Sequence, residues 1–416
     1  MHAAFVLPRF FPYRGGYENS MLEIARCLVR RGHRVSVFTT TAEALEALWL
    51  PGYRTFPAGE SSIEGVAIRR FPISYNKLAR RATRFAGLVP YWRWKAQYWR
   101  PAFHVPGLRA ALRAAEADII HVGPLPYNNL MYAGFEAAED ARVPVIATPC
   151  THFGEDGRSE VAKHYVGPHQ IALLRQCDRV LCMTESEKSK LASLGVPPEK
   201  MAVLGLGFDA QLATGGDGCR LREKYGIDGP VVLHLGMKAY EKGSMPLLAA
   251  MQQLWERGSD AWLVMAGPSL RAFDDFVRNF VKPHLREGSH WINLGPFPDS
   301  EKRDFLAAAD VVVQPSRVES LGLVLMEAWA NAKPVIAADI AVSRELIDSC
   351  NGGVLVPFDD AARLANEIER LLGNPEIRHS MGLRGQAFAR RYEGDSLWPR
   401  YAEEFERQVK TPSRGQ

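Results

Sequence analysis

The chain has 416 residues and a formal net charge of +4 at pH 7, with 47% hydrophobic and 24% charged residues. This composition is that of a globular protein with room for two domains, and so small a charge does not by itself indicate nucleic-acid binding. The six scattered cysteines form no Cys-x-x-Cys pair, no signal-peptide pattern is present, and no apolar run reaches the ~20 residues of a membrane-spanning helix, so we expect a cytoplasmic protein.

The first predicted unit is a strand, a glycine-containing loop, a helix and a second strand. Ala3–Leu7 and Val35–Phe38 are short apolar runs, and the apolar residues between them recur at helical spacing. Gly15 and Gly16 lie at the strand-to-helix turn, where nucleotide-binding folds carry glycines. A glycine pair alone equally fits a tight turn that binds nothing.

Two histidines follow later strands of the same predicted sheet. Asp118–Val122 ends in His121, and Val143–Thr148 is followed closely by His152. His152 therefore lies beyond the carboxyl end of a strand, where open α/β sheets bind ligands. A lone histidine more often makes a structural hydrogen bond, which is the interpretation that suits His121.

The chain divides near its middle. Residues Ala210–Arg220 are rich in glycine and poor in apolar side chains, which predicts a linker between domains. Strands and helices alternate on both sides of it, which predicts two parallel-sheet domains. We expect an N-terminal domain over residues 1–208, a C-terminal domain over residues 220–390, and a terminal helix and tail over residues 391–416.

The second domain opens with a strand and a lysine-containing loop. Val231–Leu235 is the strand, and Lys238 and Lys242 follow it. Two ammonium groups at the carboxyl end of a strand can neutralise a diphosphate that leaves during a reaction. Solvated surface lysines are the commoner alternative for any single position.

The stretch Asp310–Ala338 reads as strand, loop, helix and strand. Glu319 falls in the loop at the carboxyl end of the strand, Ser320 is suited to cap the helix, and Glu327 comes eight residues after Glu319. Two carboxylates so separated suit an extended ligand such as a nucleotide-diphosphate sugar, with Gly322 and free helix N–H groups near its phosphates. The alternative is that both glutamates are ordinary surface residues.

The spacing Glu319-x7-Glu327, preceded by "PS" and followed by "EAWANAKPVIA", resembles the signature of retaining glycosyltransferases of family 4. The "RGHRVSVFT" after the first helix and the pair Lys242-Gly243 match the same family. The resemblance implies the GT-B fold, in which two Rossmann-like parallel-sheet domains face a cleft and the C-terminal helix returns to the first domain. It implies transfer of a hexosyl unit from a nucleotide-diphosphate sugar to a glycan or lipid-linked acceptor, with the anomeric configuration retained.

The resemblance also implies roles for residues. His152 is to position the sugar, Glu319 to bind its hydroxyls, and Lys242 with Lys238 to stabilise the leaving diphosphate. Lys238 is a substitute here, because Met237 stands where the family carries an arginine. The donor is to be bound by the following residues: Gly15, Gly16, Gly295, Pro296, Phe297, Ser320, Leu321, Gly322, Leu323 and Glu327.

Metals and cofactors are not expected. The chain contains no Asp-x-Asp, the pair with which metal-dependent glycosyltransferases hold a divalent ion on the diphosphate. Two other functions stay open on the same residues. One is a nucleotide-sugar epimerase of the same fold, and the other is a sugar-nucleotide binding protein without catalysis, which the missing arginine at Met237 keeps in play.

Residues 65–115 are strongly basic. They contain eleven Lys or Arg and no Asp or Glu, and Tyr91, Trp92, Trp94, Tyr98 and Trp99 lie among them. The aromatic side chains fit packing onto the first domain, and equally fit an acceptor-side surface that rests on an anionic membrane at its inner face. Nucleic acid is the weaker interpretation, because no motif of a nucleic-acid-binding fold is present.

Overall fold

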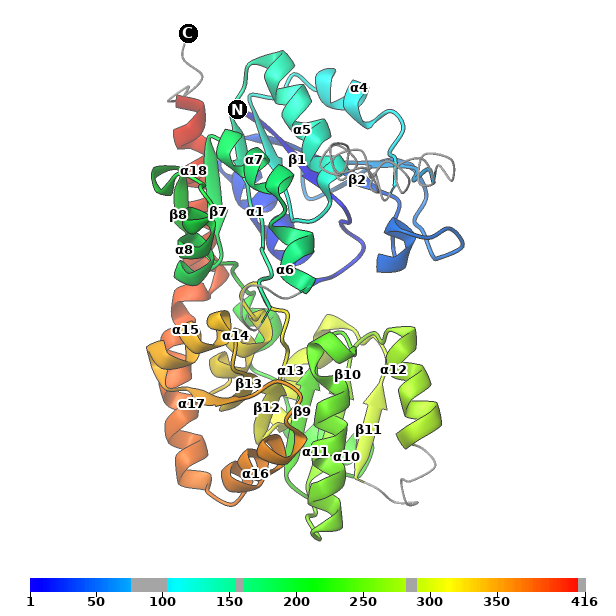
Figure 1. Ribbon diagram of the computed structural model, residues 1–416, viewed down its shortest axis with the longest axis vertical. Helices are drawn as coiled ribbons and strands as arrows, with labels where there is room; N and C mark the ends of the chain where they lie inside the picture. The colour runs from blue at the N-terminus through cyan, green and yellow to red at the C-terminus, as the bar shows by residue number, and fades with distance from the viewer. Residues whose placement is uncertain (76–102, 155–159, 282–289, 411–416) are drawn as a thin grey trace. The chain divides into compact units, whose positions relative to one another are not determined.

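The computed structural model describes residues 1–75, 103–154, 160–281 and 290–410 (Figure 1). The chain forms two compact units that are not continuous in sequence. The first comprises Met1–Thr151, Ala162–Leu206 and Ser396–Gln416, and the second comprises His152–Val161 and Gly207–Asp395. His152 thus groups with the second unit, and the end of the chain groups with the first.

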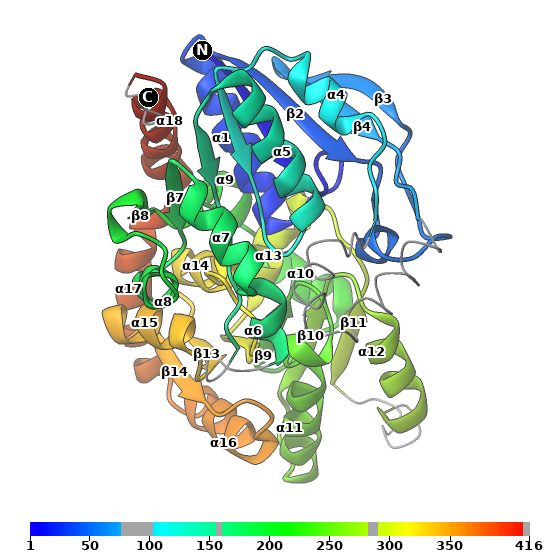
Figure 2. The same cartoon turned by 45° about the horizontal axis from the view of Figure 1, so that its top comes forward.

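The first unit is built on an eight-stranded sheet in the order β3-β4-β2-β1-β5-β6-β7-β8. All neighbouring strands are parallel except β3 and β4, which form an antiparallel pair at one edge (Figure 2). The strands are β1 His2–Leu7, β2 Arg34–Thr40, β3 Gly59–Ile63, β4 Val66–Phe71, β5 Ile119–Val122, β6 Val145–Ala147, β7 Arg179–Cys182 and β8 Met201–Val203. Every residue of β1 is buried, as expected of a central strand covered on both faces.

Helices connect these strands, as parallel pairing requires. They are α1 Gly16–Arg30, α4 Leu108–Arg113, α5 Asn128–Ala141, α6 Glu160–Tyr165, α7 Pro168–Gln176 and α8 Glu185–Ser193, with short 3₁₀ turns η1 Leu45–Leu48 and η2 Pro198–Lys200.

The last helix, α18 Gly394–Lys410, packs on the sheet of the first unit. Figure 1 shows it beside β7 and β8. The Phe405 ring stacks on Phe5 of β1 with centroids 5.3 Å apart, and Glu404 forms a 2.9 Å ion pair with Arg179 of β7. The return of the terminal helix to the first domain is therefore confirmed.

The second unit holds a six-stranded, wholly parallel sheet in the order β11-β10-β9-β12-β13-β14. Its strands are β9 Val231–Leu235, β10 Trp262–Ala266, β11 Trp291–Leu294, β12 Val311–Gln314, β13 Val335–Ala338 and β14 Gly353–Val356. The predicted α/β class with two parallel-sheet domains is confirmed, whereas the cleft between them stays a prediction.

Two helices of the second unit lie in or begin within the predicted linker. Ala210–Arg220, the predicted linker between domains, contains α9 and the start of α10, each capped by an aspartate side chain. The elements are α9 Ala210–Ala213, α10 Gly218–Tyr225, η3 Tyr240–Lys242, α11 Ser244–Glu256, α12 Arg271–Phe276, the π-helical η4 Val277–Val281, α13 Asp299–Ala308, α14 Leu323–Ala330, α15 Ala341–Cys350, α16 Ala361–Leu372, α17 Pro375–Ala389 and the 3₁₀ turn η5 Arg390–Tyr392.

Apolar side chains of α11 and α16 meet in the core of the second unit. Leu247, Met251 and Leu254 cluster with Leu364 and Ile368 over the central strands. Within the described part of the chain, no helix is both long and apolar enough to cross a membrane.

Candidate active site

Two loops meet at the carboxyl edge of the second sheet, because β9 and β12 are parallel neighbours. The loop after β9 contains Gly243, whose φ of 73° lies in the left-handed region. A Cβ on Gly243 would sit 2.2 Å from the carbonyl oxygen of Pro315, in the loop after β12. Only glycine allows this backbone approach. The backbone N–H of Arg317 also donates to the carbonyl of Glu241 at 3.1 Å, so the two loops form one surface.

Lys242 and Glu319 meet where these loops touch. The Lys242 ammonium group donates to Glu319 Oε1 at 2.8 Å and to the carbonyl of Val318 at 2.7 Å. Burial alone would raise the pKa of Glu319, but the positive charge and hydrogen bond of Lys242 outweigh it, and the pKa lies below its ordinary value. The pair therefore presents an ionised carboxylate and an ammonium group at neutral pH.

His152 lies against the same pair. Its ring is hydrogen-bonded to the backbone of Glu319. Burial, followed by the charge of Lys242, lowers the pKa of His152 to about 4, although Glu319 works in the opposite direction. The imidazole is thus neutral at pH 7 and adds hydrogen-bonding capacity without another positive charge. The structure brings together His152, Lys242 and Glu319 of the predicted set.

A buried histidine holds the Lys242 loop in place through a chain of hydrogen bonds. His234 of β9 is fully buried, its Nδ1 donates to the carbonyl of Val313 at 2.9 Å, and its Nε2 lies 3.0 Å from the Ser244 hydroxyl. The Ser244 oxygen accepts from the N–H of Ala239 at 3.2 Å. Burial lowers the pKa of His234 to about 4, which keeps the ring neutral and fixes this chain of hydrogen bonds. Sequence analysis missed His234 and Ser244, although a histidine inside the apolar run "VVLHL" was a visible signal.

The helix after the second loop begins later than predicted. Ser320 was expected to cap it, but α14 starts at Leu323 with Gly322 in the N-cap position and no capping side chain. Gly322 has a φ of 81°, which side-chain-bearing residues rarely adopt. Ser320 and Leu321 lie in the loop, and the amino end of α14 presents backbone N–H groups that suit an anion.

Glu327 lies on α14 and is almost fully buried. It forms a short ion pair with Lys302 of α13, whose side chain is 22% exposed. Sequence analysis did not identify Lys302, since the only signal was one charged residue in a helix rich in charge.

The loop predicted to face a nucleotide base follows β11. Gly295 and Pro296 are exposed, and the half-buried Phe297 ring packs edge-on against Phe305 with centroids 5.1 Å apart.

The Lys238 and Lys242 ammonium groups contact different parts of the second unit. Its ammonium group donates to Asn293 Oδ1 at 2.5 Å and to the carbonyl of Leu294 at 2.6 Å. The side chain is directed toward the end of β11, so the structure does not bring its charge to the Lys242–Glu319 pair.

Gly15 and Gly16 belong to the first unit. Gly15 is the N-cap of α1 and Gly16 its first residue. The loop before them is held by a buried ion pair between Arg9 and Glu18 at 3.3 Å, and the Arg9 guanidinium lies over the Tyr13 ring, 3.8 Å from its centroid.

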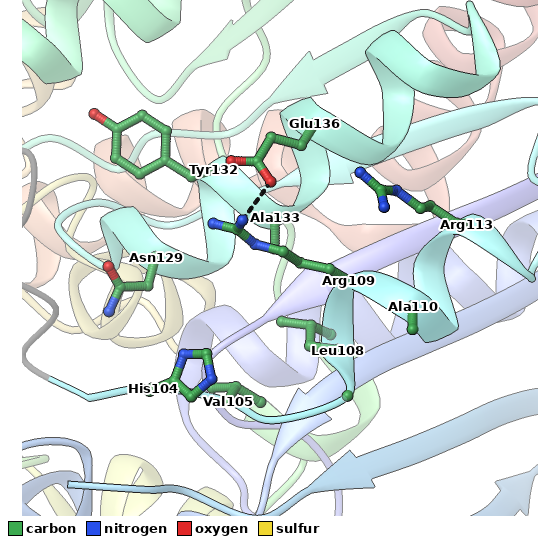
Figure 3. A pocket seen from close by; sticks show the side chains of 11 residues that line it. His104, Val105, Leu108, Arg109, Ala110, Arg113, Asn129, Tyr132, Ala133 and Glu136 are labelled. Atoms are coloured by element: carbon green, nitrogen blue, oxygen red, sulfur yellow. Dashed lines mark ion pairs between the residues drawn. The ribbon is translucent and has the colours of Figure 1, made fainter. Parts of the chain in front are cut away.

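A pocket of about 570 Å³ lies between α4 and α5 of the first unit (Figure 3). Arg109 and Glu136 form a 2.7 Å ion pair on its wall, next to Asn129 and Tyr132. None of the predicted site residues lines this pocket. Residues 104–113 of the basic stretch 65–115 form part of its lining. Residues 76–102 of that stretch, including all five aromatic residues named above, lie outside the described residues. Within the described ranges, no three His, Cys, Asp or Glu residues gather as metal ligands would.

Comparison with known proteins gives matches over both units. Residues 15–207 match the family model "Glycosyl transferase 4-like domain", and residues 220–388 match "Glycosyl transferases group 1". An alpha-D-kanosaminyltransferase of Streptomyces kanamyceticus is 29% identical over 214 residues, 50% of this chain, and the match spans about half (54%) of the relative's length. A phosphatidyl-myo-inositol mannosyltransferase of Mycolicibacterium smegmatis is 26% identical over 94% of this chain and 90% of its own. The crystal structure of Anabaena HepE in complex with UDP and glucose superposes with a TM-score of 0.73 and 20% identity, over 98% of this chain and 100% of that one.

Proposed function

The chain belongs to the glycosyltransferases of family 4, and from that membership we propose that it moves a hexosyl unit from a nucleotide-diphosphate sugar to a glycan or lipid-linked acceptor with retention of anomeric configuration. The observation that carries the proposal is the Lys242–Glu319 pair, with neutral His152 beside it, at the carboxyl edge of a parallel sheet.

Glu319 and Lys242 have different roles at the donor sugar. The ionised Glu319 carboxylate accepts hydrogen bonds from sugar hydroxyls, which fixes the ring. The Lys242 ammonium group stabilises the negative charge that develops on the diphosphate as its bond to the sugar breaks. His152 donates or accepts one hydrogen bond at the reacting face, and its neutrality avoids repulsion of a sugar that gains positive character.

The rest of the donor extends along α14 and the β11 loop. The backbone N–H groups of Gly322 and Leu323 hold the phosphates, aided by the positive end of the helix dipole. Glu327 binds the ribose, while Gly295, Pro296 and Phe297 face the base. The crystal structure of HepE contains UDP and glucose, which supports a donor of this class.

The acceptor is proposed to be a glycan or a lipid-linked molecule. The mannosyltransferase that resembles this chain over nearly its full length is named for phosphatidyl-myo-inositol, which supports a lipid-linked acceptor. The basic composition of residues 65–115, with eleven Lys or Arg and no Asp or Glu, supports contact of this stretch with an anionic membrane.

The test is transfer activity in two variants. Lys242→Met and Glu319→Gln each remove one charge from the pair, and each is expected to lower kcat about a hundredfold, the usual cost of losing one such stabilising group. Activity is measured as acceptor-dependent release of nucleoside diphosphate from a panel of nucleotide-diphosphate hexoses, and nuclear magnetic resonance of the product reports its anomeric configuration.

Lys224→Met is the matched control, because it removes an exposed lysine–glutamate ion pair from the same unit. Near wild-type turnover in both site variants, or an inverted product, contradicts the proposal. Turnover that is unchanged by a chelator such as EDTA is expected from a metal-independent enzyme, and loss of activity that magnesium restores would overturn that part.

One observation favours a second candidate, a sugar-nucleotide binding protein. Met237 replaces the family arginine, and the Lys238 ammonium group contacts Asn293 and Leu294 instead of the Lys242–Glu319 pair. Such a protein binds a nucleoside diphosphate but releases no sugar to any acceptor. An epimerase of this fold is distinguished by its conversion of donor with no acceptor present.

A further inference from the structure

Lys238 is an almost fully buried lysine whose charge is held by two oxygen atoms. The residue is 2% exposed, and its ammonium group contacts Asn293 Oδ1 at 2.5 Å and the Leu294 carbonyl at 2.6 Å. Both acceptors belong to the last two residues of β11, whereas Lys238 follows β9. In the sheet β10 separates these strands, so the side chain reaches across the end of one strand to the next.

The backbone of Lys238 makes the same kind of connection to the loop after β10. Its N–H donates to the carbonyl of Pro268 at 2.7 Å, and its carbonyl accepts from the N–H of Leu270 at 3.0 Å. Lys238 therefore connects the loops that follow β9 and β10 to the end of β11. Lys242 lies in the first of these loops, and Gly295, Pro296 and Phe297 begin the loop after β11.

The electrostatic surroundings of Lys238 are those of a charged group that holds loops in place. Burial lowers the pKa of Lys238 to about 8, which Asp274 of α12 partly opposes, and the group keeps its proton at neutral pH. The Phe273 ring centroid lies 5.9 Å from the ammonium nitrogen. A buried cation with two oxygen acceptors has specific hydrogen bonds to lose. Without them the end of β11 keeps its contact with the Gly267 N–H, which lies 3.3 Å from the Leu294 carbonyl and 3.1 Å from the Gly295 carbonyl, but loses the connection to the loop after β9.

We infer that Lys238 is a positioning residue that holds the Leu294–Phe297 loop in the place where it receives the nucleotide base, and so sets which base the protein accepts. This inference rests on the proposed function, because it takes the loop after β11 as the base-binding loop. Lys238 acts through Asn293 and Leu294, and the leaving diphosphate is stabilised without it.

Lys238→Met keeps the length of the side chain and removes its hydrogen bonds. Lys333→Met is the matched control, because Lys333 is a half-buried lysine of the same unit whose ammonium group donates to the Ala307 carbonyl at 2.9 Å. Binding of UDP, ADP, GDP, CDP and TDP to each full-length protein is measured by calorimetry. Wild type and Lys333→Met are expected to prefer one nucleotide to the same degree.

Lys238→Met is expected to bind the preferred nucleotide about tenfold more weakly while the others change little, so selectivity falls by a similar factor. With the donor sugar, KM rises and kcat stays within about twofold. A lysine needed only for folding would lower the fraction of active protein and leave the selectivity ratio unchanged.

Asn293→Ala tests the same hydrogen bond from its other end and keeps the test valid if Lys238→Met folds poorly, since Asn293 is exposed. It is expected to reduce selectivity in the same direction. Unchanged selectivity in both variants overturns the inference while the proposed function stands. A fall in kcat at constant KM also overturns it, and would indicate that Lys238 stabilises the leaving diphosphate. Wild type that binds no nucleoside diphosphate overturns the proposed function and the inference together.

Discussion

Glu327, a proposed binding residue, depends on a single ion pair for the stability of its buried carboxylate. Its carboxylate is 9% exposed and its partner Lys302 comes from the first turn of α13. Without that cation the carboxylate would be buried alone, which is costly.

We therefore expect Lys302→Met to lower the free energy of unfolding by about 2 kcal/mol and to weaken nucleoside-diphosphate binding. Urea denaturation and calorimetry measure the two effects. The exposed pair Lys224–Glu301 involves the neighbouring residue of the same helix, and Lys224→Met is expected to leave the free energy of unfolding nearly unchanged. Equal behaviour of the two variants would show that Glu327 does not depend on Lys302.

Gly243 sets the contact between the two loops that carry Lys242 and Glu319. Gly243→Ala introduces a Cβ 2.2 Å from the Pro315 carbonyl oxygen, at a φ of 73°. We expect a loss of at least about 2 kcal/mol of stability and a fall in activity, because the loops must separate.

Gly258→Ala is the control for backbone strain alone. Its φ is 87°, but a Cβ there meets nothing within 4 Å, so the expected loss is about 1 kcal/mol. Urea titration of both variants checks the difference. A loss at Gly243 no larger than at Gly258 would mean that the loop contact is not tight.

At the scale of elements, α18 is held to the first unit by its buried face. Tyr401 is fully buried and its hydroxyl donates to the Gly205 carbonyl at 2.5 Å, while Phe405 is 1% exposed against Phe5. A helix whose residues come last in sequence thus completes the core of the unit that comes first.

Phe405→Ala is expected to destabilise the protein by about 3–5 kcal/mol, since it leaves a cavity beneath α18. The measurement is the urea midpoint, followed by far-UV circular dichroism. Leu383→Ala on α17 is the control, because Leu383 is 46% exposed and its truncation should cost little. If the two variants unfold alike, α18 does not contribute to the core in solution.

At the scale of the whole molecule, burial lowers the pKa of five of the described histidines, and His121, His152 and His234 have the largest shifts. The pKa of His121 is lowered to about 3, and those of His152 and His234 to about 4. The unfolded chain binds protons at these sites from about pH 6.5 downward, whereas the folded chain does not until about pH 4. Protonation therefore favours unfolding across this window.

We expect the free energy of unfolding to fall as the pH is lowered from 6.5 toward 4, by about 1.4 kcal/mol per pH unit for each such histidine. Urea titrations at several pH values measure this slope. His121→Gln is expected to reduce the slope, and the exposed His379→Gln to leave it unchanged. A slope that His121→Gln does not alter would contradict a neutral, buried His121.

Much of the fold could be predicted from sequence because its signals are local. The apolar runs of β1, β9 and β12, and the alternation of strand and helix, follow from residue spacing, and they led to two parallel-sheet domains. The Glu319-x7-Glu327 spacing and Lys242-Gly243 are equally local, and they identified the family. The predicted start of α14 was wrong by two residues, because the left-handed Gly322 and not Ser320 takes the N-cap position.

The tertiary structure decided where the long charged side chains go. Lys238 and Lys242 follow the same strand and look equivalent in sequence, yet one contacts the end of β11 and the other contacts Glu319. The difference arises because β9 lies between β10 and β12, so its loop touches neighbours on both sides. The ion pair between Lys302 and Glu327, and the hydrogen bond from the Ala239 N–H to the Ser244 hydroxyl, likewise depend on which elements pack together. Strand order is set by contacts between distant parts of the chain, and a local pattern does not encode it.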